Sequence, residues 1–180
     1  MGGGTDGVEI RRPAILHLHT EPAWGGGENQ VLQLLKGLTQ SGYGVSLVAL
    51  PESPLATRCR QEGLDCRPVE MASDLDLLGA ARIARLARQG GFHILHAHTA
   101  RAHALGLLAR YMGAPCRLVV SRRLSVPISG HLLGRLKYRS RRVDLYLAVA
   151  RTVQSILMEA GIQAQRIQVV HSCIDLTPFD

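Results

Sequence analysis

Short apolar runs and helix-like segments alternate along almost the whole chain, and this pattern limits the possible folds more than any other feature. Seven runs are predicted to be strands, at 14–20, 44–50, 65–71, 93–99, 116–123, 143–150 and 167–175. The segments between them carry apolar residues at the three- and four-residue spacing of helices. Strands that alternate with helices form a parallel sheet through right-handed crossovers. The sequence therefore predicts an α/β fold, a Rossmann-like doubly wound parallel sheet of about seven strands with helices on both faces.

Local features refine this expectation. Pro68 cannot donate a ladder hydrogen bond, so the third strand is predicted to lie near an edge of the sheet. The helix predicted after residue 99 is rich in alanine and glycine, which suits close packing on a sheet. At the start of the segment 74–91, Asp76 and the preceding Ser73 resemble a capping box with aspartate in place of glutamate. The same segment aligns residues that we expect to point toward the sheet, namely Leu75, Gly79, Ile83 and Leu86.

The chain has 180 residues, the size of one ordinary domain. We expect a disordered segment at 1–12, one Rossmann-like domain at 13–175, and at 176–180 the start of a linker to a further, donor-binding domain. The N-terminus lacks the apolar core of a signal peptide, and no apolar run is long enough to span a bilayer. Four scattered cysteines predict no sequence-local zinc site. These features favour a reduced, cytoplasmic protein.

Three consecutive glycines join the first predicted strand to the first full helix. Bare backbone N–H groups and the positive end of a helix dipole suit a phosphate, so Gly25, Gly26 and Gly27 are candidate ligand-binding residues. The alternative is a flexible loop with no ligand. A dinucleotide-binding turn is not favoured, because Gln30 occupies the third glycine position and four residues separate the strand from the glycines. The absence of G-K-[ST] excludes a P-loop.

Two His-x-His pairs stand at strand ends, and the members of each pair share a face of the sheet. In open α/β sheets ligands bind beyond the carboxyl ends of the strands. His19 and His98 lie nearer those ends than His17 and His96, so they are the better candidates for ligand contact. His103, one helical turn further on, either faces the same cleft or faces solvent.

Such pairs also bind metal in some hydrolases. The sequence offers no clear carboxylate partner for them, apart from the distant Glu21 and Asp144. We therefore predict no metal site.

The formal net charge of +7 favours acidic partners, and one segment holds a third of the basic residues. Between 122 and 142 the chain has no acid and seven cations: Arg122, Arg123, Arg135, Lys137, Arg139, Arg141 and Arg142. An apolar stripe lies among them, made of Leu132, Leu133, Leu136 and Val143. One interpretation of the segment is a packed helix with a solvated basic face. The other is an attachment site, in which Arg135, Lys137 and Arg139 contact an anionic membrane or a phosphorylated acceptor. Nucleic acid is not predicted, because the segment lacks an aromatic platform.

Three ordered segments together resemble the N-terminal domain of family four retaining glycosyltransferases, which have the GT-B fold. They are "ILHLHT" with the following "GGGENQVLQLLKGLTQSGYGVSLVAL", then "FHILHAHTARAHALG", and then "LAVARTVQSILMEAGIQAQRIQVVHSCIDLTPF". The likeness covers nearly the whole chain. Cys173 stands where the family usually has glycine, and the family's C-terminal domain with its paired glutamates is not present.

The resemblance implies roles for particular residues. Gly25 and Gly26, next to Gly27 in the same turn, would approach the diphosphate of a nucleoside-diphosphate-sugar donor that the other domain mainly holds. His98 would lie near the transferred sugar as the catalytic residue. Arg122 and Arg123 would contact the acceptor, and we expect His19, Thr99 and His103 to be further acceptor-binding residues at the same edge. The reaction needs no metal or other cofactor, and the fragment alone would be inactive.

Further expectations concern the partners of the complete enzyme. The implied acceptor is a lipid-linked or phosphorylated glycan, as in cell-envelope synthesis, at the inner face of the membrane. Two other functions stay open at this point. They are a metal-dependent hydrolase built on the His-x-His pairs, and a non-catalytic α/β nucleotide-binding module.

Overall fold

A computed structural model describes residues 12–125, 128 and 132–172 of the chain. The expected N-terminal segment, apart from Arg12, and the expected linker at 176–180 lie outside these residues. The same holds for Cys173. No helix in the described part of the chain is both long and apolar enough to cross a bilayer.

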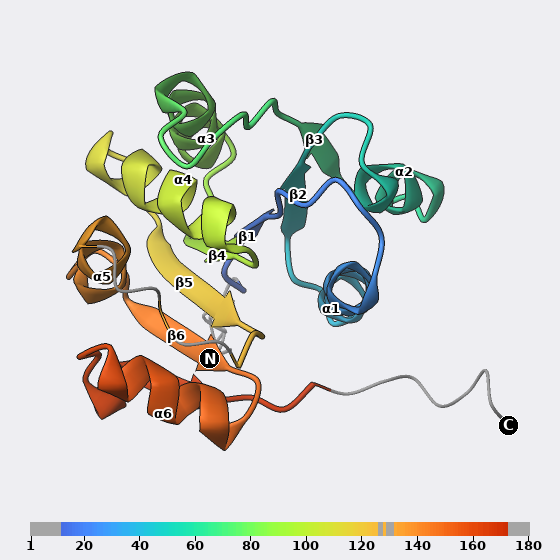
Figure 1. Ribbon diagram of the computed structural model, residues 1–180. Helices are drawn as coiled ribbons and strands as arrows, with labels where there is room; N and C mark the ends of the chain where they lie inside the picture. Colours follow the sequence, from blue (N-terminus) through green and yellow to red (C-terminus); the bar gives the residue numbers. More distant parts are fainter. Residues whose placement is uncertain (1–11, 126–127, 129–131, 173–180) are drawn as a thin grey trace, which may run out of the picture.

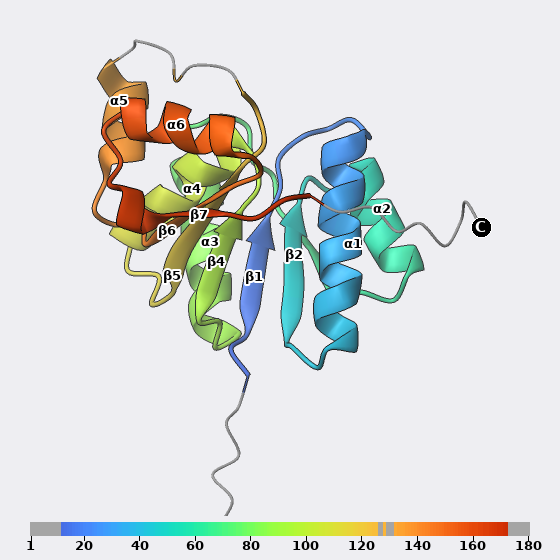
Figure 2. The same ribbon diagram turned by 90° about the horizontal axis from the view of Figure 1, so that it is seen from below.

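Seven parallel strands form one sheet, which confirms the predicted fold class (Figures 1 and 2). Their order across the sheet is β3-β2-β1-β4-β5-β6-β7. The strands are β1 (Ile15–Leu18), β2 (Val45–Ala49), β3 (Cys66–Pro68), β4 (Ile94–Ala97), β5 (Arg117–Arg122), β6 (Leu145–Ala148) and β7 (Ile167–Val169). As predicted, the strand that contains Pro68 lies at an edge. Every strand is shorter than its apolar run, because the run continues into the loop at one or both ends.

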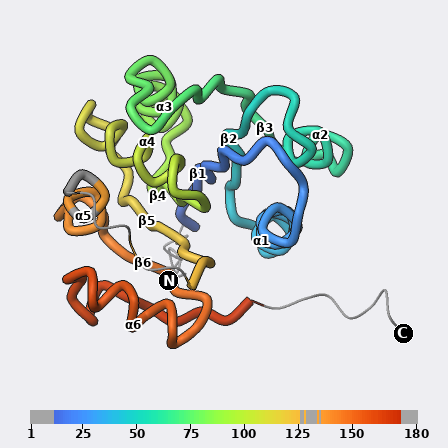
Figure 3. Tube along the Cα trace, in the orientation of Figure 1, coloured from blue at the N-terminus to red at the C-terminus, as the bar shows by residue number. Residues whose placement is uncertain are grey.

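Six helices connect the strands within the described residues. They are α1 (Gly26–Gln40), α2 (Pro54–Gln61), α3 (Leu77–Gln89), α4 (Ala100–Tyr111), α5 (Leu132–Arg139) and α6 (Arg151–Glu159), followed by a 3₁₀ turn, Ala164–Arg166. The chain runs outward from β1 through α1 and α2 to β3, then crosses back through α3 to β4 beside β1 (Figure 3). The carboxyl ends of β1 and β4 are therefore neighbours, at the point where the direction of winding reverses.

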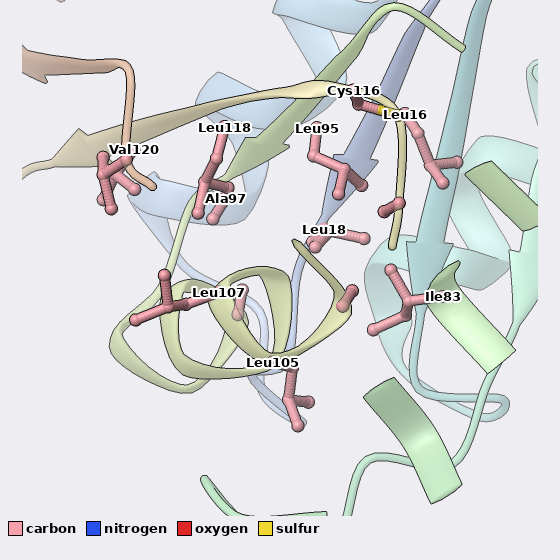
Figure 4. Packing of buried hydrophobic residues seen from close by; sticks show 14 of the residues in the cluster. Leu16, Leu18, Ile83, Leu95, Ala97, Leu105, Leu107, Cys116, Leu118 and Val120 are labelled. Atoms are coloured by element: carbon pink, nitrogen blue, oxygen red, sulfur yellow. The ribbon is translucent and has the colours of Figure 1, made fainter. Parts of the chain in front are cut away.

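Two apolar clusters hold the helices to the sheet. The larger one joins α3 and α4 to one face, and it contains Ile83, Leu105 and Leu107 together with buried residues of β1, β4 and β5 (Figure 4). The smaller one joins α1 and α2 to the other face through Leu35, Leu47 and neighbouring residues. Helices on both faces confirm the doubly wound arrangement.

Close packing of α4 depends on its small residues, as its composition predicted. A Cβ atom added at Gly106 would lie 3.0 Å from Leu118 Cδ1 and 3.3 Å from Leu18 Cδ1. Most protein Cβ atoms keep a larger distance from their neighbours. A glycine at this position lets the helix backbone approach β1 and β5.

The start of α3 differs from the sequence prediction. Asp76, not Ser73, is the N-cap, and its Oδ1 accepts a hydrogen bond of 2.8 Å from the Gly79 N–H. Leu75 precedes the helix and is 72% exposed, so its predicted inward orientation was wrong. Gly79 and Ile83 are buried as expected, and Leu86 is half-buried.

Tight turns close the amino edge of the sheet. The turns after α1, α2, α3, α4 and α6 each contain a glycine with φ between 61° and 87°: Gly42, Gly63, Gly91, Gly113 and Gly161. This left-handed conformation is costly for other residues. Each of these helices is therefore followed by a short turn of fixed conformation. The turn leads to the next strand or to the segment that precedes that strand.

Candidate functional site at the carboxyl edge of the sheet

The site lies where β1 and β4 end side by side. The loops that follow these strands bring together two threonines, and the Oγ1 atoms of Thr20 and Thr99 are 2.5 Å apart. Thr99 also caps α4, since its hydroxyl accepts a hydrogen bond from the Ala102 N–H. Two chain segments nearly eighty residues apart in sequence are thereby joined at one point on the edge.

The glycine turn leaves the N-terminus of α1 uncovered. Gly25 is the N-cap in an extended conformation, and Gly26 and Gly27 are the first two helical residues. Among the described residues, a Cβ atom added at Gly26 or Gly27 would meet nothing within 4 Å. With no capping side chain, the N–H groups of the first turn stay available to an anion.

Glu28 is the acid of this first turn, and its carboxylate is buried. Glu28 Oε1 lies 3.1 Å from His19 Nε2, and its other oxygen would lie 3.2 Å from a Cβ at Gly25. Burial lowers the pKa of His19 to about 4, although Glu28 opposes this effect. Neutral His19 therefore donates its Nε2–H to Glu28, which leaves Nδ1 as an acceptor with no hydrogen-bond partner among the described residues.

A chain of hydrogen bonds determines the tautomer of His98. Arg123 Nη2 lies 3.3 Å from His98 Nδ1, and a guanidinium group can only donate. His98 Nδ1 is therefore the acceptor, and neutral His98 carries its proton on Nε2, which lies 2.9 Å from His17 Nδ1. Burial, together with the nearby His96 and His17, holds the pKa of His98 well below its usual range.

His96 completes a buried histidine cluster with His17 and His98. His96 and His17 are register partners on adjacent strands, and His96 Nε2 is 2.7 Å from Ser121 Oγ. Burial and the positive charge of Arg123 lower the pKa of His96 to about 3. The cluster is thus uncharged at neutral pH.

The three histidines are close enough together to be considered as metal ligands. One nitrogen of each lies within 4.8 Å of the others. However, His17 and His98 already bond to each other, the Arg123 guanidinium adjoins the cluster, and no described carboxylate belongs to it. A cation would have to displace these contacts against the charge of Arg123, so the residues fit a divalent ion poorly.

Arg122 and Arg123 are adjacent in sequence, but their side chains contact different residues. Arg123 reaches the histidine cluster, whereas Arg122 Nη1 donates a hydrogen bond of 2.7 Å to the hydroxyl of Tyr138 on α5. Both border a small pocket of about 80 Å³ at the carboxyl edge, together with His98 and Thr99. These four predicted site residues therefore meet at one place.

His103 faces neither the small pocket nor solvent, so both predicted orientations were wrong. It is fully buried, with its ring edge-on to Tyr138 and Tyr146, and burial lowers its pKa to about 3. It packs between α4, α5 and β6 and does not border the small pocket. Acceptor binding by His103 stays a prediction.

The sequence profile of Glycosyltransferase Family 4 matches residues 24–178. The chain belongs to Glycosyltransferase Family 4. A search of curated protein sequences finds no match. The family 4 domain has the fold of the N-terminal lobe of a GT-B glycosyltransferase.

Solved structures share this fold. A glycosyltransferase from Rickettsia africae superposes with a TM-score of 0.77 at 19% identity, over 94% of this chain and 45% of that one. HepE from Anabaena, solved in complex with UDP and glucose, has a TM-score of 0.72 at 19% identity, over 92% and 46%. The lipopolysaccharide outer core galactosyltransferase WaaB has a TM-score of 0.69 at 12% identity, over 92% and 47%. The chain thus spans less than half the length of these proteins.

Sequence reasoning missed two residues of the candidate site. Glu28 could have been found, because an acid in the first turn of a helix beside a strand-end histidine is a recognisable pair. Ser121 gave no signal, since its contact with His96 depends on the pairing of β4 with β5.

The predicted basic contacts on α5 are only partly described. Lys137 Nζ donates to the Ala100 carbonyl at 3.1 Å and lies 3.6 Å from Asp74, and Arg139 is exposed. The side chain of Arg135 lies outside the described part of the chain. Membrane or phosphate contact by these residues stays a prediction.

Proposed function

We propose that this family 4 domain is the acceptor-side lobe of a retaining glycosyltransferase that uses a nucleoside-diphosphate sugar. The observation that carries the proposal is the uncovered N-terminus of α1, where Gly26 and Gly27 leave open space and the next residue, Glu28, contacts His19 of the candidate site. HepE, which has the same fold, was solved with UDP and with UDP-glucose. The second lobe of the full-length protein would hold most of the donor.

In the proposed reaction the bond between the anomeric carbon and the diphosphate oxygen breaks, and a bond to the acceptor hydroxyl oxygen forms on the same face. The acceptor proton passes to the departing phosphate oxygen. The N–H groups and the dipole of α1 stabilise the charge that develops on the diphosphate. This route requires no metal and no other cofactor.

We assign His98 to the sugar side of the reaction as a neutral group. Its Nε2–H and Nδ1 are both held by internal partners, His17 and Arg123, so the ring has a defined orientation. The proposed acceptor contacts are Arg122, Arg123, Thr99 and His19. His103, which is buried behind these residues, would act on the acceptor only through packing. Cations near the site suit a phosphorylated or lipid-linked glycan acceptor of the cell envelope, in the cytoplasm or at the inner face of the membrane.

Substitution of Gly26 tests the proposal. In the full-length protein, Gly26→Ala and Gly26→Val should raise the KM for the donor by about tenfold or more, because each side chain occupies space proposed for the diphosphate. The melting temperature of Gly26→Ala should not fall, since an added Cβ meets no described atom within 4 Å. Donor kinetics and thermal melting measure the two effects.

Gly37→Ala is the matched control. It adds the same methyl group to an exposed position further along α1, where no described atom lies within 4 Å. Unchanged donor KM in both Gly26 variants would contradict the proposed donor contact.

A further inference from the structure

An apolar groove crosses the outer surface of α4, between the loop before α3 and α5. Figure 1 shows α3, α4 and α5 on the same side of the sheet. The groove has a volume of about 440 Å³, and its apolar lining includes Leu75, Leu107, Tyr111 and Leu136. Leu75 is 72% exposed, Tyr111 59% and Leu136 56%. Large apolar side chains gathered in one exposed hollow indicate contact with an apolar partner.

Cations border the groove at both ends. At one end Lys137 Nζ lies 3.6 Å from Asp74 Oδ2, and Arg101 Nε lies 3.8 Å from Oδ1 of the same carboxylate. At the other end the Arg142 guanidinium stacks 4.7 Å from the centre of the Tyr111 ring. Three cations against one carboxylate leave a net positive charge around an apolar floor. This combination suits an amphipathic anion.

We propose that the groove binds an anionic phospholipid at a bilayer surface. One hydrocarbon chain would lie along α4, and the phosphate would meet Lys137 and Arg101. From Ala104 to Tyr111 the helix extends about 10 Å, at 1.5 Å per residue, so the groove would hold part of one hydrocarbon chain. A nucleic acid would not bury the apolar residues of the groove, and a neutral apolar peptide would not pair with its cations.

The groove also lies next to the candidate site. Lys137 donates to the carbonyl of Ala100, the first residue of α4, which directly follows His98 and Thr99. A lipid bound here would bring the bilayer surface to the carboxyl edge of the sheet. The inference thus extends the proposed function to the membrane, but its test involves no sugar transfer, so the two can fail separately.

Vesicle binding by the 180-residue chain tests the proposal. The chain should bind vesicles of phosphatidylcholine with phosphatidylglycerol and bind pure phosphatidylcholine far more weakly. Leu136→Glu and Leu75→Glu should each lower the partition coefficient by about tenfold or more, since each removes an inserted leucine. Lys137→Gln should lower it up to about fivefold, because a basic residue near an anionic surface contributes about 1 kcal/mol.

Control variants on α6 distinguish lipid binding in the groove from a general effect of charge on vesicle binding. Met158→Glu places the same charge on an exposed apolar residue of α6, and Arg151→Gln removes a cation from α6. Both should retain wild-type partitioning within about twofold. Leu136→Gln, which adds no charge, replaces Leu136→Glu if thermal melting shows that the latter does not fold.

A fluorescence reporter locates the inserted surface. The chain has one tryptophan, Trp24, whose ring contacts Arg58 of α2 on the other side of the molecule. Brominated lipid should quench Leu136→Trp but leave the wild-type emission unchanged. Equal binding to neutral vesicles, equal losses in Met158→Glu and Leu136→Glu, or no added quenching in Leu136→Trp would each overturn the proposal.

Discussion

At the scale of single residues, the domain keeps five histidines buried and uncharged. Burial is the main cause of the lowered pKa in His17, His19, His96, His98 and His103. Each ring is nevertheless polar, and the hydrogen bonds to Arg123, Ser121 and Glu28 satisfy part of that polarity. The arrangement orients the ring of His98 without placing a second positive charge beside Arg123.

We expect the free energy of unfolding to fall as the pH drops from 6.5 toward 4. In this window the unfolded chain binds protons at histidines that stay neutral in the folded state, so folding loses up to about 1.4 kcal/mol per pH unit for each such group. The pKa of His103 is about 3, so it contributes across the whole window. Urea unfolding at pH 7, 6, 5 and 4 measures the slope.

His103→Phe provides the control for this slope. The ring stays aromatic in a pocket walled by Tyr138 and Tyr146, and one proton-binding group is removed. The free energy of unfolding should depend less steeply on pH in the variant, because one fewer proton is taken up on unfolding. A stability independent of pH between 7 and 4 in the wild type would show that these histidines are not neutral when folded.

At the scale of elements, α4 is a central helix on its face of the sheet. The glycine within α4 determines how closely the helix packs against the strands. The helix packs against β4, β5 and α3 and begins directly at the candidate site. Its distance from the strands therefore also fixes where Thr99 and His98 lie.

Gly106→Ala should destabilise the domain by about 1–3 kcal/mol, because its methyl group must displace Leu118 or Leu18 in a packed core. Helix propensity alone would predict the opposite sign. Gly37→Ala, at an exposed position of α1, supplies the comparison and should stabilise by about 1 kcal/mol or less. Chemical denaturation of the two variants gives both values, and a gain in stability at both positions would contradict the packing argument.

The order of the elements could be predicted from the sequence, but contacts across the sheet could not. Alternation of apolar runs and helices predicted seven strands, and Pro68 predicted the edge strand. The predicted inward orientation of Leu75 was wrong, because the helix begins one turn later than predicted, after the Asp76 N-cap. The link from Arg123 through His98 to His17 required the pairing of β1, β4 and β5, which no local pattern records. Likewise, spacing alone could not tell which side of α4 His103 faces.

At the scale of the whole molecule, the domain offers one wall of the proposed active site. HepE and the Rickettsia africae glycosyltransferase are more than twice as long as the matched region. The glycine turn presents N–H groups to a diphosphate from one side, so most donor contacts would have to come from elsewhere in a complete enzyme.

The 180-residue chain alone should therefore transfer sugar at least about a hundredfold more slowly than the full-length protein, since most of the electrostatic stabilisation of the leaving group is missing. A panel of nucleoside-diphosphate sugars, with nucleoside diphosphate release as the readout, measures this difference. Thermal melting of the same sample shows whether the isolated chain is folded. Comparable turnover by the two proteins would contradict the divided donor site.

The positive-φ glycine turns at the amino edge have a consequence for divergence of the fold. Gly42, Gly63, Gly91, Gly113 and Gly161 bring the chain back from their helices by defined paths, so inserted residues there would shift strand register. In the described part of the loops at the opposite edge, no residue has a positive φ. Residues inserted after β3 would consequently leave the strand register unchanged, so acceptor preference can diverge there while the scaffold is conserved.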